Sequence, residues 1–191
     1  MILNVLGMDP SMRNWGVCSA TVDSHYLEDV EIKDISVIQT EKITSKTMRT
    51  NCIDLDTARQ LADRLLPIPK VHAIFSESPV GSQSGSSMKS YGMCMGLLGA
   101  IQSETNNIIT VSSSDIKVLL GGSKKTSKKA IIEYAYDLYP NLDWPVKTNG
   151  KIILGEAEHI ADAIGAVLVG ILSDEFKQLV NSINQIEESY K

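Results

Sequence analysis

The chain has 191 residues, of which 43% are hydrophobic and 21% are charged, and its formal net charge is −5. This length fits one domain with a sizeable core, and the net charge excludes a protein that coats nucleic acid indiscriminately. The longest apolar stretch near the C-terminus, Ile160–Leu172, is too short to span a bilayer, and the N-terminus lacks the basic region of a signal peptide. Three widely spaced cysteines fit a reducing compartment. We therefore expect a cytoplasmic protein without a membrane segment.

The first part of the chain predicts a meander of strands followed by a helix and a further strand. Short apolar or alternating runs predict these strands, and apolar residues at helical spacing predict the helix. In chain order the elements are strands at Ile2–Met8, Trp15–Val22 and Ile32–Gln39, a helix from Asp54 to Leu66, and a strand at Val71–Phe75.

The second part is predicted to be mainly helical. The expected elements are a Ser/Gly-rich loop at 79–87, a helix over 87–104, a strand at Ile108–Val111, a short helix at Ile116–Leu120 capped by Ser113 or Ser114, a helix from Ser127 to about Tyr139, a loop at Pro140–Gly155, and helices at Glu156–Leu172 and Asp174–Ile186. Strands early and helices late indicate one α/β domain.

Two acidic residues come directly after apolar strands, Asp9 after the first and Glu77 after the fourth. Taken singly, such an acid is most simply a turn residue that ends its strand. Ligand sites in α/β sheets, however, lie in the crevice beyond the strand ends. If the two strands are neighbours, the two carboxylates meet at one edge of the sheet.

A late helix adds His159 and Asp162, which are three residues apart and therefore share one helix face. Asp162 lies within an apolar run, where an unpaired carboxylate is costly, so a metal ion or a basic partner would explain it. Clustered oxygen ligands suit Mg²⁺ or Mn²⁺, which hold phosphate oxygens and activate water. The sequence thus predicts a catalytic site for two divalent ions at Asp9, Glu77, His159 and Asp162. His159 serves there either as a ligand or as a proton acceptor.

A basic segment runs from Lys117 to Lys129 and contains no acid. Its lysines are Lys117, Lys124, Lys125, Lys128 and Lys129. A local basic patch on an acidic protein predicts one surface that faces DNA. Arg13, after the first strand, either lines the same path or is a plain loop residue.

Four segments together resemble the RuvC-type Holliday-junction resolvases, members of the RNase H-like nuclease superfamily. These segments are LGMDPSMRNWGV (Leu6–Val17), IFSESP (Ile74–Pro79), IKVLLGGSKKTSKKAII (Ile116–Ile132) and HIADAIGAVLVG (His159–Gly170). Each motif alone is weak, but their order and spacing are specific. The match runs from Ile2 to about Leu172.

The resemblance implies an RNase H-like fold, with a five-stranded mixed sheet flanked by helices over residues 1–173 and a peripheral helix and tail over 174–191. It implies that Asp9, Glu77 and Asp162 are metal-site acids and that His159 takes the fourth position. It also implies a homodimer that nicks opposing strands of a four-way junction and leaves 5′-phosphate and 3′-hydroxyl ends.

DNA contacts are implied as well. Lys117 and Lys128 match basic positions that family members place near the junction backbone. Family members often carry an aromatic shortly after the glutamate that corresponds to Glu77, and residues 78–86 contain none. The nearest candidate is Tyr91 on the next helix, and we include Lys89 on that helix as a further DNA contact.

Two alternatives stay open. One is a nuclease of the same superfamily that acts on flaps, replication forks or RNA–DNA hybrids, because lysine contacts to phosphate do not specify the substrate. The other is a junction-binding protein without catalysis, which His159 in place of an acid would suit. The sugar-kinase and actin-like ATPases are excluded, because the chain is too short for two domains and lacks glycines after Asp9 to cradle phosphate.

Overall fold

A five-stranded mixed sheet organises the protein, and its strand order is β3-β2-β1-β4-β5. The computed structural model describes residues 1–42, 47–78, 84–103 and 107–189. The strands are β1 (Ile2–Asp9), β2 (Asn14–Asp23), β3 (Val30–Gln39), β4 (Ala73–Glu77) and β5 (Ile108–Val111). The first three form an antiparallel meander, whereas β4 pairs parallel to β1 and β5 pairs parallel to β4. This is the RNase H-like arrangement expected from the sequence, and the prediction of the fold is confirmed.

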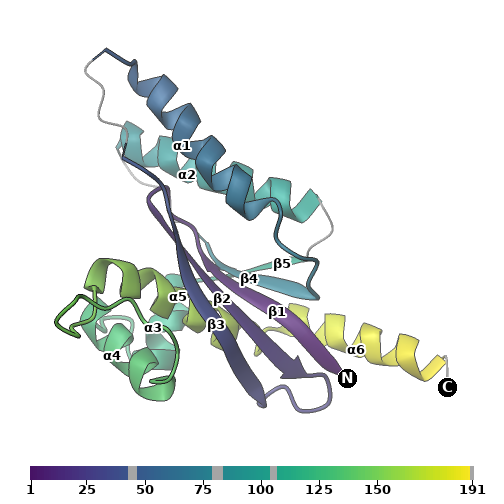
Figure 1. Cartoon of the computed structure of the whole chain (residues 1–191). Coiled ribbons are helices and arrows are strands. Elements are labelled where there is room, and N and C mark those ends of the chain that lie inside the picture. The colour runs from purple at the N-terminus through teal and green to yellow at the C-terminus, as the bar shows by residue number, and fades with distance from the viewer. Residues whose placement is uncertain (43–46, 79–83, 104–106, 190–191) are drawn as a thin grey trace.

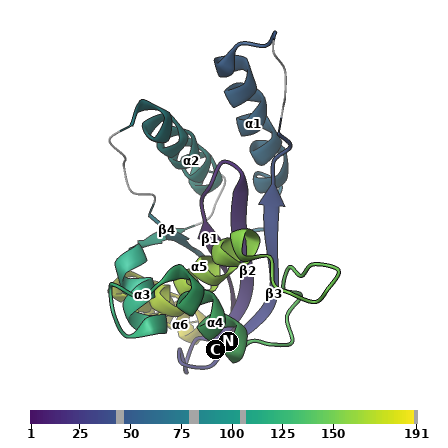
Figure 2. The same ribbon diagram turned by 90° about the vertical axis from the view of Figure 1, so that its left-hand side faces the viewer.

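In the described part of the chain, helices lie on both faces of the sheet (Figures 1 and 2). They are α1 (Thr50–Leu65), α2 (Gly85–Ser103), α3 (Ser113–Gly121), α4 (Lys128–Leu138), α5 (Leu154–Gly170) and α6 (Asp174–Ser189). Helix α5 contacts every strand, and α3 and α4 pack against α5. Helices α1 and α2 contact each other and form the other layer. Within the described residues, no helix is long and apolar enough to cross a membrane.

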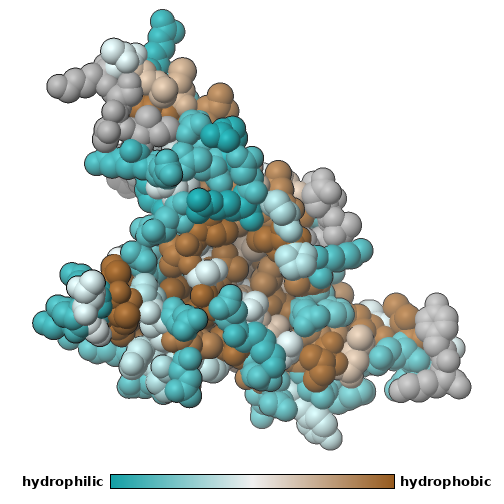
Figure 3. Space-filling view, in the orientation of Figure 1, coloured by the Kyte–Doolittle hydropathy of each residue, from teal (hydrophilic) through white to brown (hydrophobic). Residues whose placement is uncertain are grey.

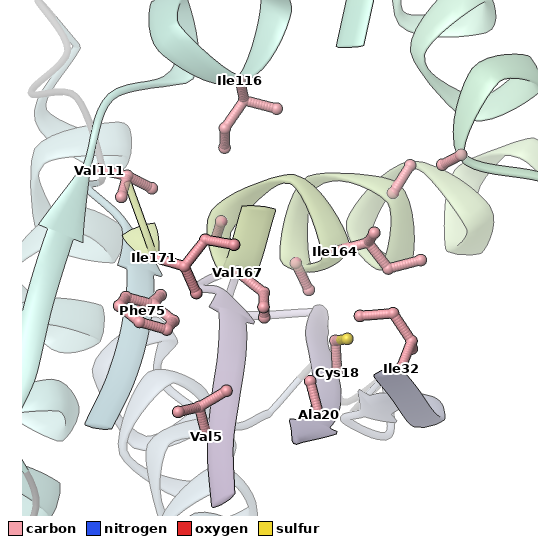
Figure 4. Packing of buried hydrophobic residues seen from close by; sticks show 14 of the residues in the cluster. Val5, Cys18, Ala20, Ile32, Phe75, Val111, Ile116, Ile164, Val167 and Ile171 are labelled. Carbon is pink, nitrogen blue, oxygen red and sulfur yellow. The ribbon is translucent and has the colours of Figure 1, made fainter. Parts of the chain in front are cut away.

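Helix α5 is seated directly on the sheet because two glycines remove the side chains beneath it. A Cβ added at Gly7 in β1 would lie 2.0 Å from the backbone oxygen of Ala163, and one at Gly16 in β2 would lie 2.1 Å from that of His159. Figure 4 shows Ile164 and Val167 of α5 among the side chains of the strands. The larger core forms around this contact, and α6 contributes the fully buried Phe176 to it.

The second core lies on the opposite face, where Leu6 and Met8 of β1 meet Leu61 of α1 and Leu98 of α2. Alternation along β1 therefore sends Leu3 and Val5 to one core and Leu6 and Met8 to the other. The side of α1 that faces the viewer in Figure 3 is largely hydrophilic.

Several predicted boundaries were wrong by a few residues. Helix α1 begins at Thr50 rather than Asp54, β4 begins at Ala73 rather than Val71, and α5 begins at Leu154 rather than Glu156. The loop predicted at 79–87 falls partly outside the described residues, since 79–83 are not described.

The predicted cap of α3 was also wrong. Ser112, and not Ser113 or Ser114, caps this helix, because its side chain accepts a hydrogen bond from the backbone N–H of Asp115. Serines stand at three consecutive positions there, so the sequence alone does not distinguish among them. The predicted cap of α4 was correct, since Ser127 accepts a hydrogen bond from the backbone N–H of Ala130.

Candidate active site

Two strand ends bring the first two acids together. Asp9 is the last residue of β1 and Glu77 the last residue of β4. The parallel register pairs Met8 with Ser76, so the next residue of each strand is the acid. Both carboxylates therefore lie at the same end of the sheet, as the sequence predicted for neighbouring strands.

Helix α5 brings the other two candidates to this end. Asp9 pairs with Gly16 across the β1–β2 ladder, and the backbone of His159 rests on that glycine. His159 Nδ1 lies 2.5 Å from Asp9 Oδ2. When Nδ1–H donates to this oxygen, the neutral imidazole keeps its lone pair on Nε2, whereas the protonated imidazole carries a proton on both nitrogens. Asp162 follows one turn later on the same face of the helix.

The four side chains line one pocket of about 190 Å³. Its walls come from β1 and β4 at the sheet end and from α3, α4 and α5 above it. The full lining is Asp9, Pro10, Ser11, Glu77, Ser113, Lys117, Lys128, Ile131, Ile132, Glu158, His159 and Asp162. Sequence segments that are 150 residues apart at Asp9 and His159 thus build one polar hollow.

Two of the carboxyl groups hold their protons unusually tightly. Burial, together with the charges of Asp9 and Glu77, raises the pKa of Asp162 to about 8. Burial and the charge of Asp9 raise the pKa of Glu77 to about 7, although a hydrogen bond with Ser113 and the charges of Lys117 and Lys128 oppose this rise. The site therefore crowds more negative charge than its two lysines neutralise.

The histidine responds to the same charges in the opposite direction. Burial by itself would lower the pKa of His159, but the hydrogen bond to Asp9 and the charges of Asp9, Glu158 and Asp162 together raise it above its ordinary value. The carboxylates thus favour the protonated form of the imidazole, whose charge would partly offset theirs.

The donor set fits a hard divalent cation, because carboxylate oxygens are the ligands that Mg²⁺ and Mn²⁺ prefer. The raised pKa values of Glu77 and Asp162 also show that the pocket would be stabilised by added positive charge. As the side chains stand, no group of three or more His, Cys, Asp or Glu residues is arranged to hold a metal ion within the described ranges.

The predicted basic residues divide into two groups. Lys117 and Lys128 line the acidic pocket, and Lys128 forms an ion pair with Glu158. Lys124 and Lys125 are exposed in the turn between α3 and α4, and Lys129 is exposed beside it, 3.3 Å from Glu133. The basic turn therefore adjoins the site.

Three other predicted DNA contacts lie away from the pocket lining. Lys89 of α2 forms an ion pair with Asp54 of α1, and Tyr91 is half-buried on α2. Arg13 donates to the backbone oxygen of Glu41 at 3.1 Å, which ties the β1–β2 loop to the end of β3. Their roles in DNA binding stay predictions.

Sequence reasoning missed two residues of the site. Glu158 lines the pocket beside His159, and Ser113 hydrogen-bonds Glu77. Glu158 was detectable in principle, because it lies four residues before Asp162 and therefore on the same helix face. No pattern in the sequence distinguished Ser113 from its neighbouring serines.

No protein-family model matches the chain, and no curated protein matches it by sequence. Solved structures do match. RuvC from T. thermophilus in complex with a Holliday junction substrate aligns with a TM-score of 0.63 and 15% identity, over 92% of this chain and 97% of that one. Another structure of Thermus thermophilus RuvC aligns with a TM-score of 0.59 and 17% identity, over 88% and 92% of the two chains. The chain thus has the fold of RuvC, as its four motifs led us to expect.

Proposed function

We propose that this protein is a divalent-metal-dependent endonuclease that resolves four-way DNA junctions. The observation that carries the proposal is the pocket in which Asp9, Glu77 and Asp162 converge with His159 at the end of the sheet. The raised pKa values of two of these acids support a site that is completed by a cation. The likeness in fold to a RuvC that was solved with a Holliday junction supports the choice of substrate.

The acids and the histidine have different proposed roles in the reaction. Asp9, Glu77 and Asp162 would hold the metal, and Nε2 of His159 is available either as a further ligand or as a proton acceptor. The chemistry that bound Mg²⁺ or Mn²⁺ supplies is neutralisation of the phosphate charge and activation of water. Asp9 keeps the imidazole in one tautomer through the Nδ1 hydrogen bond. Hydrolysis at this site would leave a 5′-phosphate and a 3′-hydroxyl.

The lysines would position the DNA backbone. Lys117 and Lys128 lie within the pocket, where they can contact the phosphate that is cut. Lys124, Lys125 and Lys129 extend the basic surface along the adjoining turn. Such contacts supply affinity and register but no base specificity, which suits an enzyme that selects DNA by its branched shape.

A homodimer would place two such sites on one junction, and α2 supports this part of the proposal. The helix is apolar in composition, yet Met88 and Met95 are exposed, and Cβ atoms added at Gly92, Gly96 or Gly99 would meet no atom within 4 Å. A face of this kind allows two helices to approach closely. Gly96→Glu should therefore yield a folded monomer in analytical ultracentrifugation. A monomeric parent protein, or a dimer that tolerates this change, would contradict α2 as the interface.

The function is tested by cleavage of an end-labelled four-way junction in Mg²⁺ or Mn²⁺, with flap, fork and RNA–DNA hybrid substrates beside it. We expect paired symmetric nicks in the junction and none in EDTA. Asp9→Asn should abolish cleavage and retain junction binding, whereas Asp143→Asn, at an exposed loop position, should leave both unchanged. Preferential cutting of another substrate would favour a related nuclease, and binding without cleavage in any metal would favour a non-catalytic junction binder.

A further inference from the structure

One acid in the pocket has no part in the proposed chemistry. Glu158 precedes His159 on α5, lies on the same face as Asp162, and forms an ion pair with Lys128 at the start of α4. Its side chain is 26% exposed, whereas that of Lys128 is 70% exposed. The acid is therefore fixed in the pocket wall, and the lysine reaches to it from a solvated position.

The environment of Lys128 strengthens this attachment. A hydrogen bond to Glu158 is the main cause that raises the pKa of Lys128, and the charges of Glu158, Asp162 and Asp9 add to it. The ammonium group thus neutralises part of the acidic pocket. The same group lies at the end of the basic turn, where DNA phosphates would arrive.

We propose that Glu158 is a positioning residue that holds Lys128 at the mouth of the pocket and competes with a DNA phosphate for its ammonium group. The inference rests on the proposed function in that the phosphate belongs to DNA. When the backbone enters the site, Lys128 exchanges Glu158 for the phosphate, and the ion pair re-forms when the DNA leaves. Phosphates that reach only Lys124 and Lys125 leave the pair intact.

The physical properties of the pair suit such an exchange. Ion pairs with an exposed partner are weak, so a phosphate can displace the carboxylate at little cost. Lysine is also the appropriate residue, because its ammonium is a point charge on a flexible stem and can reorient without losing a planar bidentate contact. A buried arginine–carboxylate pair would resist the same exchange.

The first test measures, without DNA, how strongly Glu158 restrains the ammonium group of Lys128. The acetylation rate of Lys128 by a small acylating reagent, followed by peptide mass spectrometry, should rise severalfold in Glu158→Gln and stay unchanged in Glu156→Gln, the matched control two residues earlier on α5. Lys124, exposed in the same turn, serves as the internal reference. An unchanged rate in Glu158→Gln would overturn the inference even if the protein proved not to bind DNA.

The second test measures the competition, with the full-length protein and a four-way junction in EDTA. Glu158→Gln should tighten binding by about two- to five-fold, the range expected for a weak ion pair. It should also steepen the salt dependence by up to about one unit in the slope of log K against log salt. In the parent protein the displaced Glu158 carboxylate takes up a cation when DNA binds, and the variant has no such carboxylate. Both gains should vanish in a Lys128→Met background.

The outcomes separate the two proposals. An equal gain in the Lys128→Met background, or in Glu156→Gln, would mean that the pocket responds only to net charge, and it would overturn the role of Glu158. If the parent protein binds the four-way junction no better than duplex DNA, the proposed function fails instead. Thermal midpoints of all variants, measured in parallel, establish that each is folded.

Discussion

Replacing Asp162 by asparagine should make the metal-free protein more stable while abolishing cleavage. The pKa of this carboxyl is raised from 3.8 to about 8, mainly by burial and by the charges of Asp9 and Glu77. The native state therefore binds a proton that the unfolded chain releases above about pH 4. A raised carboxyl pKa costs stability progressively as the pH rises through this interval, and the cost is absent below it.

The magnitude follows from the shift. At pH 7 the folded carboxyl is still protonated, and the interval from 3.8 to 7 corresponds to about 4 kcal/mol at about 1.36 kcal/mol per pH unit. Asparagine resembles the protonated acid in shape and removes the ionisation of the unfolded state. The free energy of unfolding should accordingly rise by up to about 4 kcal/mol, or roughly 8–16 °C in Tm for a chain of this size.

The assay is thermal unfolding in EDTA between pH 4 and pH 8, with Asp143→Asn as the control at an exposed position. The stabilisation by Asp162→Asn should be near zero at pH 4 and grow toward pH 8. Added Mg²⁺ should stabilise the parent protein and leave the variant unchanged. A variant that is less stable at pH 7, or a gain that does not depend on pH, would refute the idea that this carboxylate is strained by its neighbours.

Three further outcomes are expected. Gly16→Ala should lower the free energy of unfolding by about 1–3 kcal/mol or more in chemical denaturation and reduce cleavage, because the added Cβ would lie 2.1 Å from the backbone oxygen of His159. A stable and active variant would contradict the close packing of α5 on the sheet. The affinity for Mg²⁺ should rise with pH up to about 8, because binding releases protons from Glu77 and Asp162. Calorimetry in buffers of different ionisation enthalpy measures this proton release, and binding without it would argue against these two ligands. Lys124→Ala should weaken binding to all branched DNA and lower the salt slope by about one, whereas an unchanged slope would remove this lysine from the interface.

The fold was largely accessible from the sequence, because its signals are local. Apolar runs such as Ile2–Met8 are long enough to identify strands, and the spacing of apolar residues in the segment that becomes α5 identifies a helix. The first and last residues of the helices and strands were harder to predict from the sequence. The first turn of α1 carries Thr50, Asn51 and Cys52, which are poor helix formers, and its helical state depends on contacts that the local sequence does not encode.

A residue of the pocket could be predicted from the sequence where its chemical type was unusual for its place in a strand or helix. Asp9 and Glu77 were selected because each ends an apolar strand, and Asp162 because it interrupts an apolar helix; the structure brings all three into one pocket. Glu158 was missed because an acid in the first turns of a helix is ordinary, and only the approach of α4 reveals its partner Lys128. The ion pair between Lys89 and Asp54 of α1 was likewise not detectable in the sequence, and the role of Lys89 in DNA binding stays a prediction.

The presence of Glu158 also gives a physical reason for histidine, rather than a carboxylate, at position 159. The pocket already contains the carboxylates of Asp9, Glu77, Glu158 and Asp162, opposed by two lysines. A further carboxylate beside Asp9 would raise the cost of ionising Asp162, whose pKa is already about 8. An imidazole in its place donates a hydrogen bond to Asp9, and the neighbouring carboxylates favour its protonated form. His159 and Glu158 therefore act as a coupled pair. A histidine at position 159 keeps the negative charge of the pocket low enough to include the carboxylate of Glu158, and that carboxylate restrains Lys128.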